Sequence, residues 1–268
     1  MSVEHARFTD DIPSAYDRGL GPVIFHDFAD HTARHVAALG PRRLLETCAG
    51  TGIVTRRMRD LLPATTPIVA TDLNDAMLNV ARAKFAADEP VEFQSADATA
   101  LPFPDRSFHV LVCQFGVMFF PDKAKGYREA YRVLMPGGRY VFSVWDGSVR
   151  GAPLATDDVV RRLFSADPPQ FYTLTAAYNR IDLIKEAITE AGFTRLRVEV
   201  VTRDTEVADV AGFAHALVYA NPLIDMIRAR GSVPPDVAVE AIAEALTNEF
   251  GSPARWRRQA IVFEVTRE

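Results

Sequence analysis

Short apolar runs alternate with amphipathic stretches along the first half of the chain. The apolar runs predict buried strands at 43–47, 68–71, 91–94, 110–113 and 139–145. Apolar residues spaced by three and four predict helices between them, at 53–62, 75–87 and 123–134. Strands that alternate with helices indicate an α/β fold, built on a parallel sheet with crossover helices.

The last part of the chain has a different pattern. A helix is predicted over 181–191, and strands are predicted at 196–201 and 260–265. Between these two strands, residues 207–251 are mostly helical in pattern, with breaks at Asn221-Pro222 and Pro234-Pro235. The two strands suit a hairpin whose long connection forms a helical lid.

The two ends of this α/β region are expected to carry additions. Residues 1–40 are interpreted as an N-terminal helical cap, in which Gly21-Pro22 separates a first apolar stripe from a helix over 23–39. The stripe consists of Phe8, Ile12, Tyr16 and Leu20. Residues 41–268 then form the main domain, with insertions at about 147–180 and 205–252; the first has no clear period and contains glycine, proline and aromatic residues.

A glycine loop follows the first strand. Gly50 and Gly52 lack a Cβ, so they allow a tight turn in which the backbone can approach a ligand. Asp72 ends the second strand, where its carboxylate can accept hydrogen bonds from both hydroxyls of a ribose. Strand, loop, helix and terminal acid together predict a site for a ligand that contains adenosine.

Two further segments reach the same edge of the predicted sheet. Ligands of open parallel sheets bind outside the carboxyl ends of the strands. Asp97-Ala98 follows the third strand and Gln114-Phe115 follows the fourth. The Asp97 carboxylate can accept from an exocyclic amine and the Ala98 amide can donate to a ring nitrogen, so this pair can recognise adenine.

These motifs, in this order, resemble the class I S-adenosylmethionine-dependent methyltransferases, and within them the ubiquinone/menaquinone-biosynthesis-like (methyltransferase type 11) branch. The resemblance covers about residues 42–146 and rests on Glu46-Thr47-Cys48-Ala49-Gly50-Thr51-Gly52, Asp72-Leu73-Asn74, Ala96-Asp97-Ala98, Leu101-Pro102-Phe103, Phe108 and Leu134-Met135-Pro136-Gly137-Gly138-Arg139. One position departs from the family pattern: Cys48 stands where the family commonly has glycine.

The resemblance implies a Rossmann-like seven-stranded sheet of order 3-2-1-4-5-7-6, with strand 7 antiparallel, helices on both faces and a helical lid. It implies S-adenosyl-L-methionine as cofactor and S-adenosyl-L-homocysteine as product. Glu46 and the glycine loop would hold the methionine portion, Asp72 the ribose, Asp97 and Ala98 the adenine, and Gln114-Phe115 would border the sulfonium. The expected cofactor-binding set is Glu46, Ala49, Gly50, Gly52, Asp72, Leu73, Asp97, Ala98, Gln114 and Phe115.

The acceptor half of the site is less defined by the sequence. In-line methyl displacement needs mainly alignment of the two reactants, with a general base for some nucleophiles. The candidates for such a base are Tyr16, His26, His31, His215 and Tyr219. Aromatic and Met residues in loops and lid favour a small, planar or partly apolar acceptor: Phe115, Met118, Phe119, Trp145, Phe171, Tyr172, Tyr178, Phe213 and Tyr219. His31 and His35 share a helix face, but no third ligand completes a motif, so no metal is expected.

Composition narrows the partners. The chain has 268 residues, a net charge of −5 and a pI of about 5.7, so no nucleic-acid partner is expected. The polar start, Met1 to Pro13, and the lack of a long apolar run predict a cytoplasmic protein without a membrane partner. Cys48 and Cys113 are expected as free thiols. The lid and the N-terminal helices could pair two copies as a homodimer.

Two other functions remain open from the sequence. Gly50-Thr51-Gly52 with Asp72 also fits a nicotinamide-dependent oxidoreductase, although no tyrosine has a lysine four positions later, as a short-chain dehydrogenase requires. A non-catalytic cofactor-binding or assembly protein of the same fold is the second alternative, because no universal catalytic base marks the family.

Overall fold

The computed structural model describes Phe8 and residues 11–268, and its sheet confirms the expected strand order. Seven strands lie in the order β3-β2-β1-β4-β5-β7-β6, and β7 runs antiparallel to both of its neighbours. The other pairs are parallel. The strands are β1 (Leu44–Thr47), β2 (Ile68–Asp72), β3 (Val91–Ser95), β4 (Phe108–Gln114), β5 (Leu134–Trp145), β6 (Arg195–Val207) and β7 (Ala254–Thr266).

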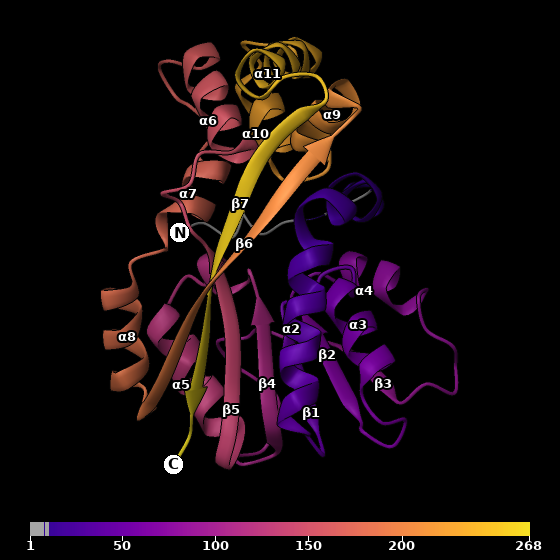
Figure 1. The fold of residues 1–268 in the computed structure, drawn as a ribbon, viewed down its shortest axis with the longest axis vertical. Helices are drawn as coiled ribbons and strands as arrows, with labels where there is room; N and C mark the ends of the chain where they lie inside the picture. Colours follow the sequence, from indigo (N-terminus) through magenta and orange to yellow (C-terminus); the bar gives the residue numbers. More distant parts are fainter. Residues whose placement is uncertain (1–7, 9–10) are drawn as a thin grey trace.

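Helices cover both faces of this sheet (Figure 1). Successive side chains of a strand point to opposite faces, so Leu44 packs in the core beneath α2 and α3, whereas Leu45 packs in the core beneath α5 and α8. The helices that surround the sheet are α2 (His26–Leu39), α3 (Ile53–Leu61), α4 (Asp75–Arg82), α5 (Lys123–Val133) and α8 (Ile181–Glu190). The helix predicted over 75–87 therefore ends at Arg82, five residues early.

The last two strands are longer than the sequence predicts. β6 and β7 pair from Arg195 with Thr266 to Val207 with Ala254, whereas β5 pairs with β7 only as far as Ala260. Beyond that point they form a two-stranded ribbon that rises from the sheet into a group of helices (Figure 1). Charged cross-strand pairs such as Arg257 with Asp204 solvate the ribbon and obscure its apolar alternation.

The group of helices at the end of the ribbon is the lid. It consists of α6 (Ala152–Leu163), α7 (Phe171–Ala177), α9 (Val210–Tyr219), α10 (Leu223–Arg230) and α11 (Pro235–Phe250). Residues 147–180 show no clear helical period in the sequence, yet α6 and α7 form there. α6 buries small residues such as Ala152 and Ala155, which give a weak hydrophobic signal. The lid has a core of its own, which also includes Leu20 and Ile24 from the N-terminal segment.

The N-terminal segment is one nearly continuous helix within the described residues. α1 (Ile12–Ala15) passes into a π-helix, η2 (Tyr16–Phe25), and then into α2, so the predicted break at Gly21-Pro22 is wrong. Pro22 lacks a donor, and the wider turn spans it with a bond from the His26 amide to the Gly21 carbonyl. The predicted cap at 1–7 and 9–10 lies outside the described residues.

Across the described part of the chain, no single helix has the length and apolar composition to cross a bilayer. α9 and α10, which meet at an angle of 72°, pass that test only when they are counted together.

Candidate functional site: a cavity between the sheet edge and the lid

The glycine loop lies where the carboxyl ends of β1 and β2 meet. The Ala49 amide donates to the Thr71 carbonyl at 2.9 Å, and the Gly50 amide donates to Asp72 Oδ2 at 2.9 Å. Both bonds tie the loop after β1 to the end of β2. They form because the strands are neighbours in register, so the loop and Asp72 are held together before any ligand binds.

Cys48 has a backbone conformation that favours glycine. Its φ is +55°, in the left-handed region that glycine adopts without strain. Its thiol contacts that of Cys113 on β4, and both cysteines are free, as expected. This hydrogen bond and burial raise the pKa of the Cys48 thiol, so the sulfur stays protonated at neutral pH.

The residues at the ends of β2 and β3 fit an adenosine group. Asp72 is 8% exposed and faces the cavity, and burial raises the pKa of its carboxyl. Its Oδ1 accepts from the backbone amide of Asn74 at 2.9 Å and from the side-chain amide of Asn74 at 3.2 Å. Leu73 is 53% exposed at the cavity wall, an apolar surface on which a flat base can lie. Asp97 Oδ1 accepts hydrogen bonds from the backbone amide and the hydroxyl of Thr99, whereas Asp97 Oδ2 accepts none from the described residues.

Glu46 lies at the other end of the loop and is 1% exposed. Thr55 of α3 donates to its Oε2 at 2.6 Å. Burial raises the pKa of this carboxyl to about 8, because the charged form is poorly solvated there. A cationic group placed beside it would offset that cost, which suits the ammonium of an amino-acid tail.

The buried carboxyl of Glu46 predicts a stability that depends on pH. The folded protein keeps the Glu46 proton up to about pH 8, while the unfolded chain releases it near its ordinary pKa of 4.5. The free energy of unfolding is therefore expected to fall between these values, by up to ~1.4 kcal/mol per pH unit. Urea denaturation of the wild type and Glu46→Gln from pH 5 to pH 8 measures it. The variant should lose less stability, and parallel curves would contradict the prediction.

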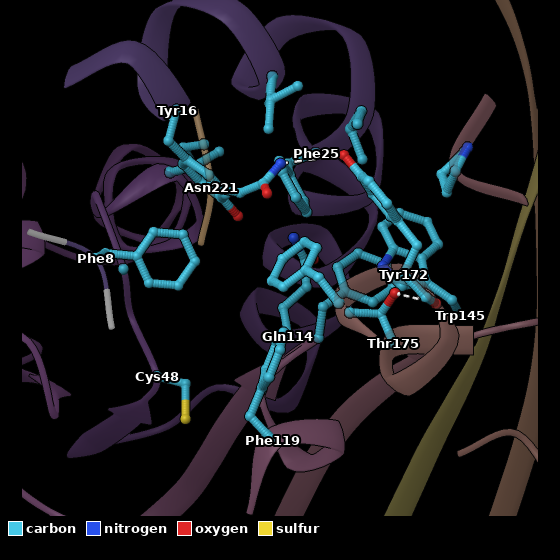
Figure 2. Close-up of a pocket in the computed structure, with 18 of the residues that line it drawn as sticks. Phe8, Tyr16, Phe25, Cys48, Gln114, Phe119, Trp145, Tyr172, Thr175 and Asn221 are labelled. Atoms are coloured by element: carbon cyan, nitrogen blue, oxygen red, sulfur yellow. Dashed lines mark hydrogen bonds between the residues drawn. The ribbon is translucent and has the colours of Figure 1, made fainter. Parts of the chain in front are cut away.

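A cavity of about 270 Å³ joins this adenosine end to the underside of the lid. Its lid half is aromatic: Phe115 stacks on Trp145 with ring centres 3.7 Å apart, and Phe28 packs edge-on against both. In Figure 2, Phe8, Tyr16 and Cys48 lie toward one end, and Tyr172, Thr175 and Trp145 lie toward the other. The arrangement can hold a flat, largely apolar molecule next to the loop.

Nine of the ten expected cofactor-binding residues line this cavity: Glu46, Ala49, Gly50, Asp72, Leu73, Asp97, Ala98, Gln114 and Phe115. Gly52 does not. Its φ is +75°, and a Cβ there would lie 2.8 Å from the Cβ of Ala81, so Gly52 allows the loop to pack against α4. Their roles in binding stay predictions.

The aromatic set divides in a similar way. Phe115, Phe119, Trp145, Phe171, Tyr172 and Phe213 line the cavity. Met118, Tyr178 and Tyr219 do not line it; Tyr178 is hydrogen-bonded to Tyr127 instead. Phe25, Asn221 and Trp256 also line the cavity, and the sequence pattern did not predict them there. Phe25 lies at the end of the unexpected π-helix, and Trp256 lies on the ribbon, so both were hidden by mistaken element boundaries.

Of the five candidate bases, only Tyr16 lines the cavity. His26, His31, His215 and Tyr219 do not line it. His31 faces Glu199 on β6 at 3.6 Å, and its neighbour His35 contacts Glu264 on β7 at 2.6 Å, so the two imidazoles have separate partners. His215 stacks on Tyr219, which donates to Asp236 on the lid.

Tyr16 stacks on Phe25 with ring centres 5.0 Å apart. Burial, followed by the charges of Asp72 and Asp17, raises its pKa well above 10. The phenol is therefore protonated at neutral pH and suits a hydrogen-bond donor better than a general base. The Thr51 hydroxyl donates to Asp17 Oδ1 at 2.6 Å, and this bond joins the N-terminal helix to the glycine loop.

The strand order, the glycine loop and the carboxylates at the sheet edge define the fold of the S-adenosylmethionine-dependent methyltransferases. The model of the ubiE/COQ5 methyltransferase family matches residues 12–148, just over half of the chain. The chain belongs to the ubiE/COQ5 methyltransferase family.

Curated relatives match over the same region. The demethylmenaquinone methyltransferase of Clavibacter sepedonicus is 39% identical over 137 residues, which are 49% of this chain and 54% of that protein. The ubiquinone/menaquinone biosynthesis C-methyltransferase UbiE of Enterobacter sp. (strain 638) is 39% identical over 99 residues, 36% of this chain and 39% of that protein. The chain thus matches about half, or less, of the length of these relatives.

Solved structures share the fold at low identity. The YcgJ protein of Bacillus subtilis aligns with a TM-score of 0.59 and 20% identity, covering 91% of this chain and all of that one. Phosphoethanolamine N-methyltransferase 2 of Haemonchus contortus was solved in complex with phosphomonomethylethanolamine and S-adenosylhomocysteine. It aligns with a TM-score of 0.62 and 17% identity, covering 99% of this chain and 59% of that one. The [4+2]-cyclase SpnF aligns with a TM-score of 0.57 and 19% identity, covering 95% of this chain and 93% of that one. At such identities these likenesses establish the fold alone.

Proposed function

We propose that the chain binds S-adenosylmethionine at the edge of β1 to β4 and transfers its methyl group to a small, planar, partly apolar acceptor held under the lid. The single observation that carries the proposal is the continuity of the cavity. Asp72, Asp97 and Glu46 line one end of it, and Phe115 and Trp145 line the other. Family membership favours this cofactor over a nicotinamide.

When bound, S-adenosylmethionine supplies an electrophilic methyl group. The chain's own contribution is to bind, to orient and to exclude water. Asp72 and Asp97 would bind the ribose and the base, and Glu46 would face the amino-acid tail. The stacked Phe115 and Trp145 would fix the plane of a flat acceptor, and full alignment of two reactants can lower a barrier by about 7–11 kcal/mol.

Part of the acceptor end lies outside the family match. The match ends at residue 148, whereas Phe171, Tyr172 and Phe213, which line the acceptor end, come from the lid. Two curated relatives are named for menaquinone or ubiquinone biosynthesis, which makes a quinol-type ring one acceptor to test. Asp146 also lines the cavity, and it accepts hydrogen bonds from Ser148 and Gln259.

Methyl transfer can be tested with S-adenosylmethionine labelled in the methyl group. The protein is incubated with a panel of phenols, quinols and amines of one and two rings, and the label is followed into the organic phase. Transfer to a planar acceptor is the expected result. Wild-type protein that binds neither S-adenosylmethionine nor its product would refute the proposal. Tight binding of both with no transfer to any panel member would favour the non-catalytic alternative.

The other partner assignments stay proposals. The net charge of −5 supports a protein that acts without nucleic acid. A homodimer, a cytoplasmic location and independence from membranes are likewise proposed, and light scattering of the purified protein tests the first of these.

A further inference from the structure

One hydrogen bond at the boundary of the two halves of the cavity is not used by the proposed function. Thr32 lies on α2 and is 3% exposed, and its hydroxyl donates to Oε1 of Gln114 at 2.8 Å. Phe28, one turn earlier on the same helix, packs edge-on against Phe115. Two successive residues at the end of β4 are thus held by two residues one turn apart on α2.

The bond to Thr32 orients the side-chain amide of Gln114. A primary amide carries its acceptor oxygen and its donor nitrogen on opposite sides, so fixing Oε1 on Thr32 turns Nε2 away from the helix. Nε2 has no hydrogen-bond partner among the described residues, and it is not one of their sealed, unpartnered polar atoms. Gln114 lines the cavity, so a donor turned away from α2 can reach a ligand there.

Three other polar side chains around the acceptor end already have hydrogen-bond partners. The Tyr172 hydroxyl donates to the Leu217 carbonyl at 2.7 Å. The Asn221 amide donates to the same carbonyl and to Tyr172. Gln259 donates to Asp146 at 2.6 Å. Of these four side chains, Gln114 alone has a donor atom with no hydrogen-bond partner, and it adjoins the flat surface of Phe115 and Trp145. The indole nitrogen of Trp256 also lacks a partner among the described residues, but it is fully buried.

We propose that Gln114 donates a hydrogen bond to an oxygen atom of the planar acceptor, and that Thr32 is a positioning residue that keeps the amide nitrogen turned toward it. This inference rests on the proposed function, since it assumes that an acceptor occupies the aromatic end. The bond would fix the rotation of a ring that stacking alone leaves free to turn in its plane. It would therefore select oxygenated rings over bare hydrocarbons of the same shape.

Binding of two simple probes tests the proposal without knowledge of the natural acceptor. Equilibrium dialysis measures the affinities of 1-naphthol and naphthalene for the full chain saturated with S-adenosylhomocysteine. The wild type is expected to prefer 1-naphthol by about fivefold, the effect of one neutral hydrogen bond. Gln114→Leu, which keeps the volume, and Thr32→Val, which removes only the hydroxyl, should each lower the preference to about twofold or less.

Thr32→Ser is the matched control, because it keeps the hydroxyl and should therefore retain the wild-type preference for 1-naphthol over naphthalene. A purely structural role of Thr32 would change the melting temperature but leave the ratio of the two affinities unchanged, so both are measured. A wild type that binds neither probe, or shows no preference, overturns the proposal, as does an unchanged preference in Gln114→Leu. Failure of the wild type to bind S-adenosylhomocysteine would instead contradict the proposed function.

Discussion

Replacing Asp72 with alanine is expected to weaken the binding of S-adenosylhomocysteine by at least about a hundredfold, because each charge-assisted hydrogen bond is worth about 1.5–3 kcal/mol and two ribose hydroxyls lose their acceptor. The substitution also frees the Gly50 amide, which Asp72 Oδ2 holds at 2.9 Å. The loop loses an anchor at the same time as the ligand loses its partner. Isothermal titration calorimetry measures the change directly.

Two variants sharpen this experiment. Asp72→Asn keeps an acceptor oxygen without the charge, so its affinity should fall between those of the wild type and the alanine variant. Asp75 lies three residues away with a side chain 68% exposed and only a long 3.8 Å contact to Arg82. Asp75→Ala should therefore bind like the wild type. If Asp72→Ala binds S-adenosylhomocysteine within about threefold of the wild-type affinity, Asp72 does not hydrogen-bond the ligand, since one such bond is worth more than that.

Replacing Gly52 with alanine is expected to destabilise the fold by about 2–5 kcal/mol, the sum of a left-handed backbone penalty and of overpacking. Gly52 has a φ of +75°, and its new Cβ would lie 2.8 Å from the Cβ of Ala81 and 3.3 Å from its Cα. α4 would have to move away from the loop that shapes the cavity. Thermal unfolding should show a midpoint lowered by about 5–15 °C.

Gly40→Ala is the matched control for this clash. Gly40 also has a positive φ, +59°, but a Cβ there meets nothing within 4 Å. It should cost only the backbone penalty, about 1–2 kcal/mol. Equal midpoints for the two variants would show that the approach of the loop to Ala81 does not matter. A larger loss in Gly52→Ala, accompanied by weaker cofactor binding, is the expected result.

The cofactor half of this protein was predictable because its determinants are local. Each strand ends in a residue that acts where it stands: Glu46 after β1, Asp72 at the end of β2 and Asp97 after β3. A parallel sheet brings the carboxyl ends of its strands to one edge, so a correct strand order places these residues together without knowledge of side-chain packing. The strand order itself and the antiparallel β7 were implied by the family resemblance, and the structure confirms both.

The acceptor half was decided by contacts between segments far apart in the chain. The sequence could not show that the π-helix spans Pro22 and carries Phe25 into the cavity, or that the ribbon brings Trp256 beneath the lid. It ranked Tyr16 with four other side chains, and only packing separated Tyr16 from them.

By itself, then, the sequence determined the glycine loop and the acids at the strand ends, and its motifs implied the strand order through the family resemblance. Once that order is set, backbone geometry alone brings the loop and the acids together. Only the tertiary structure decided the aromatic chamber, the protonated state of Glu46 and the bond from Thr32 to Gln114. Burial and side-chain orientation depend on which distant residues pack against a position, and no local pattern encodes that.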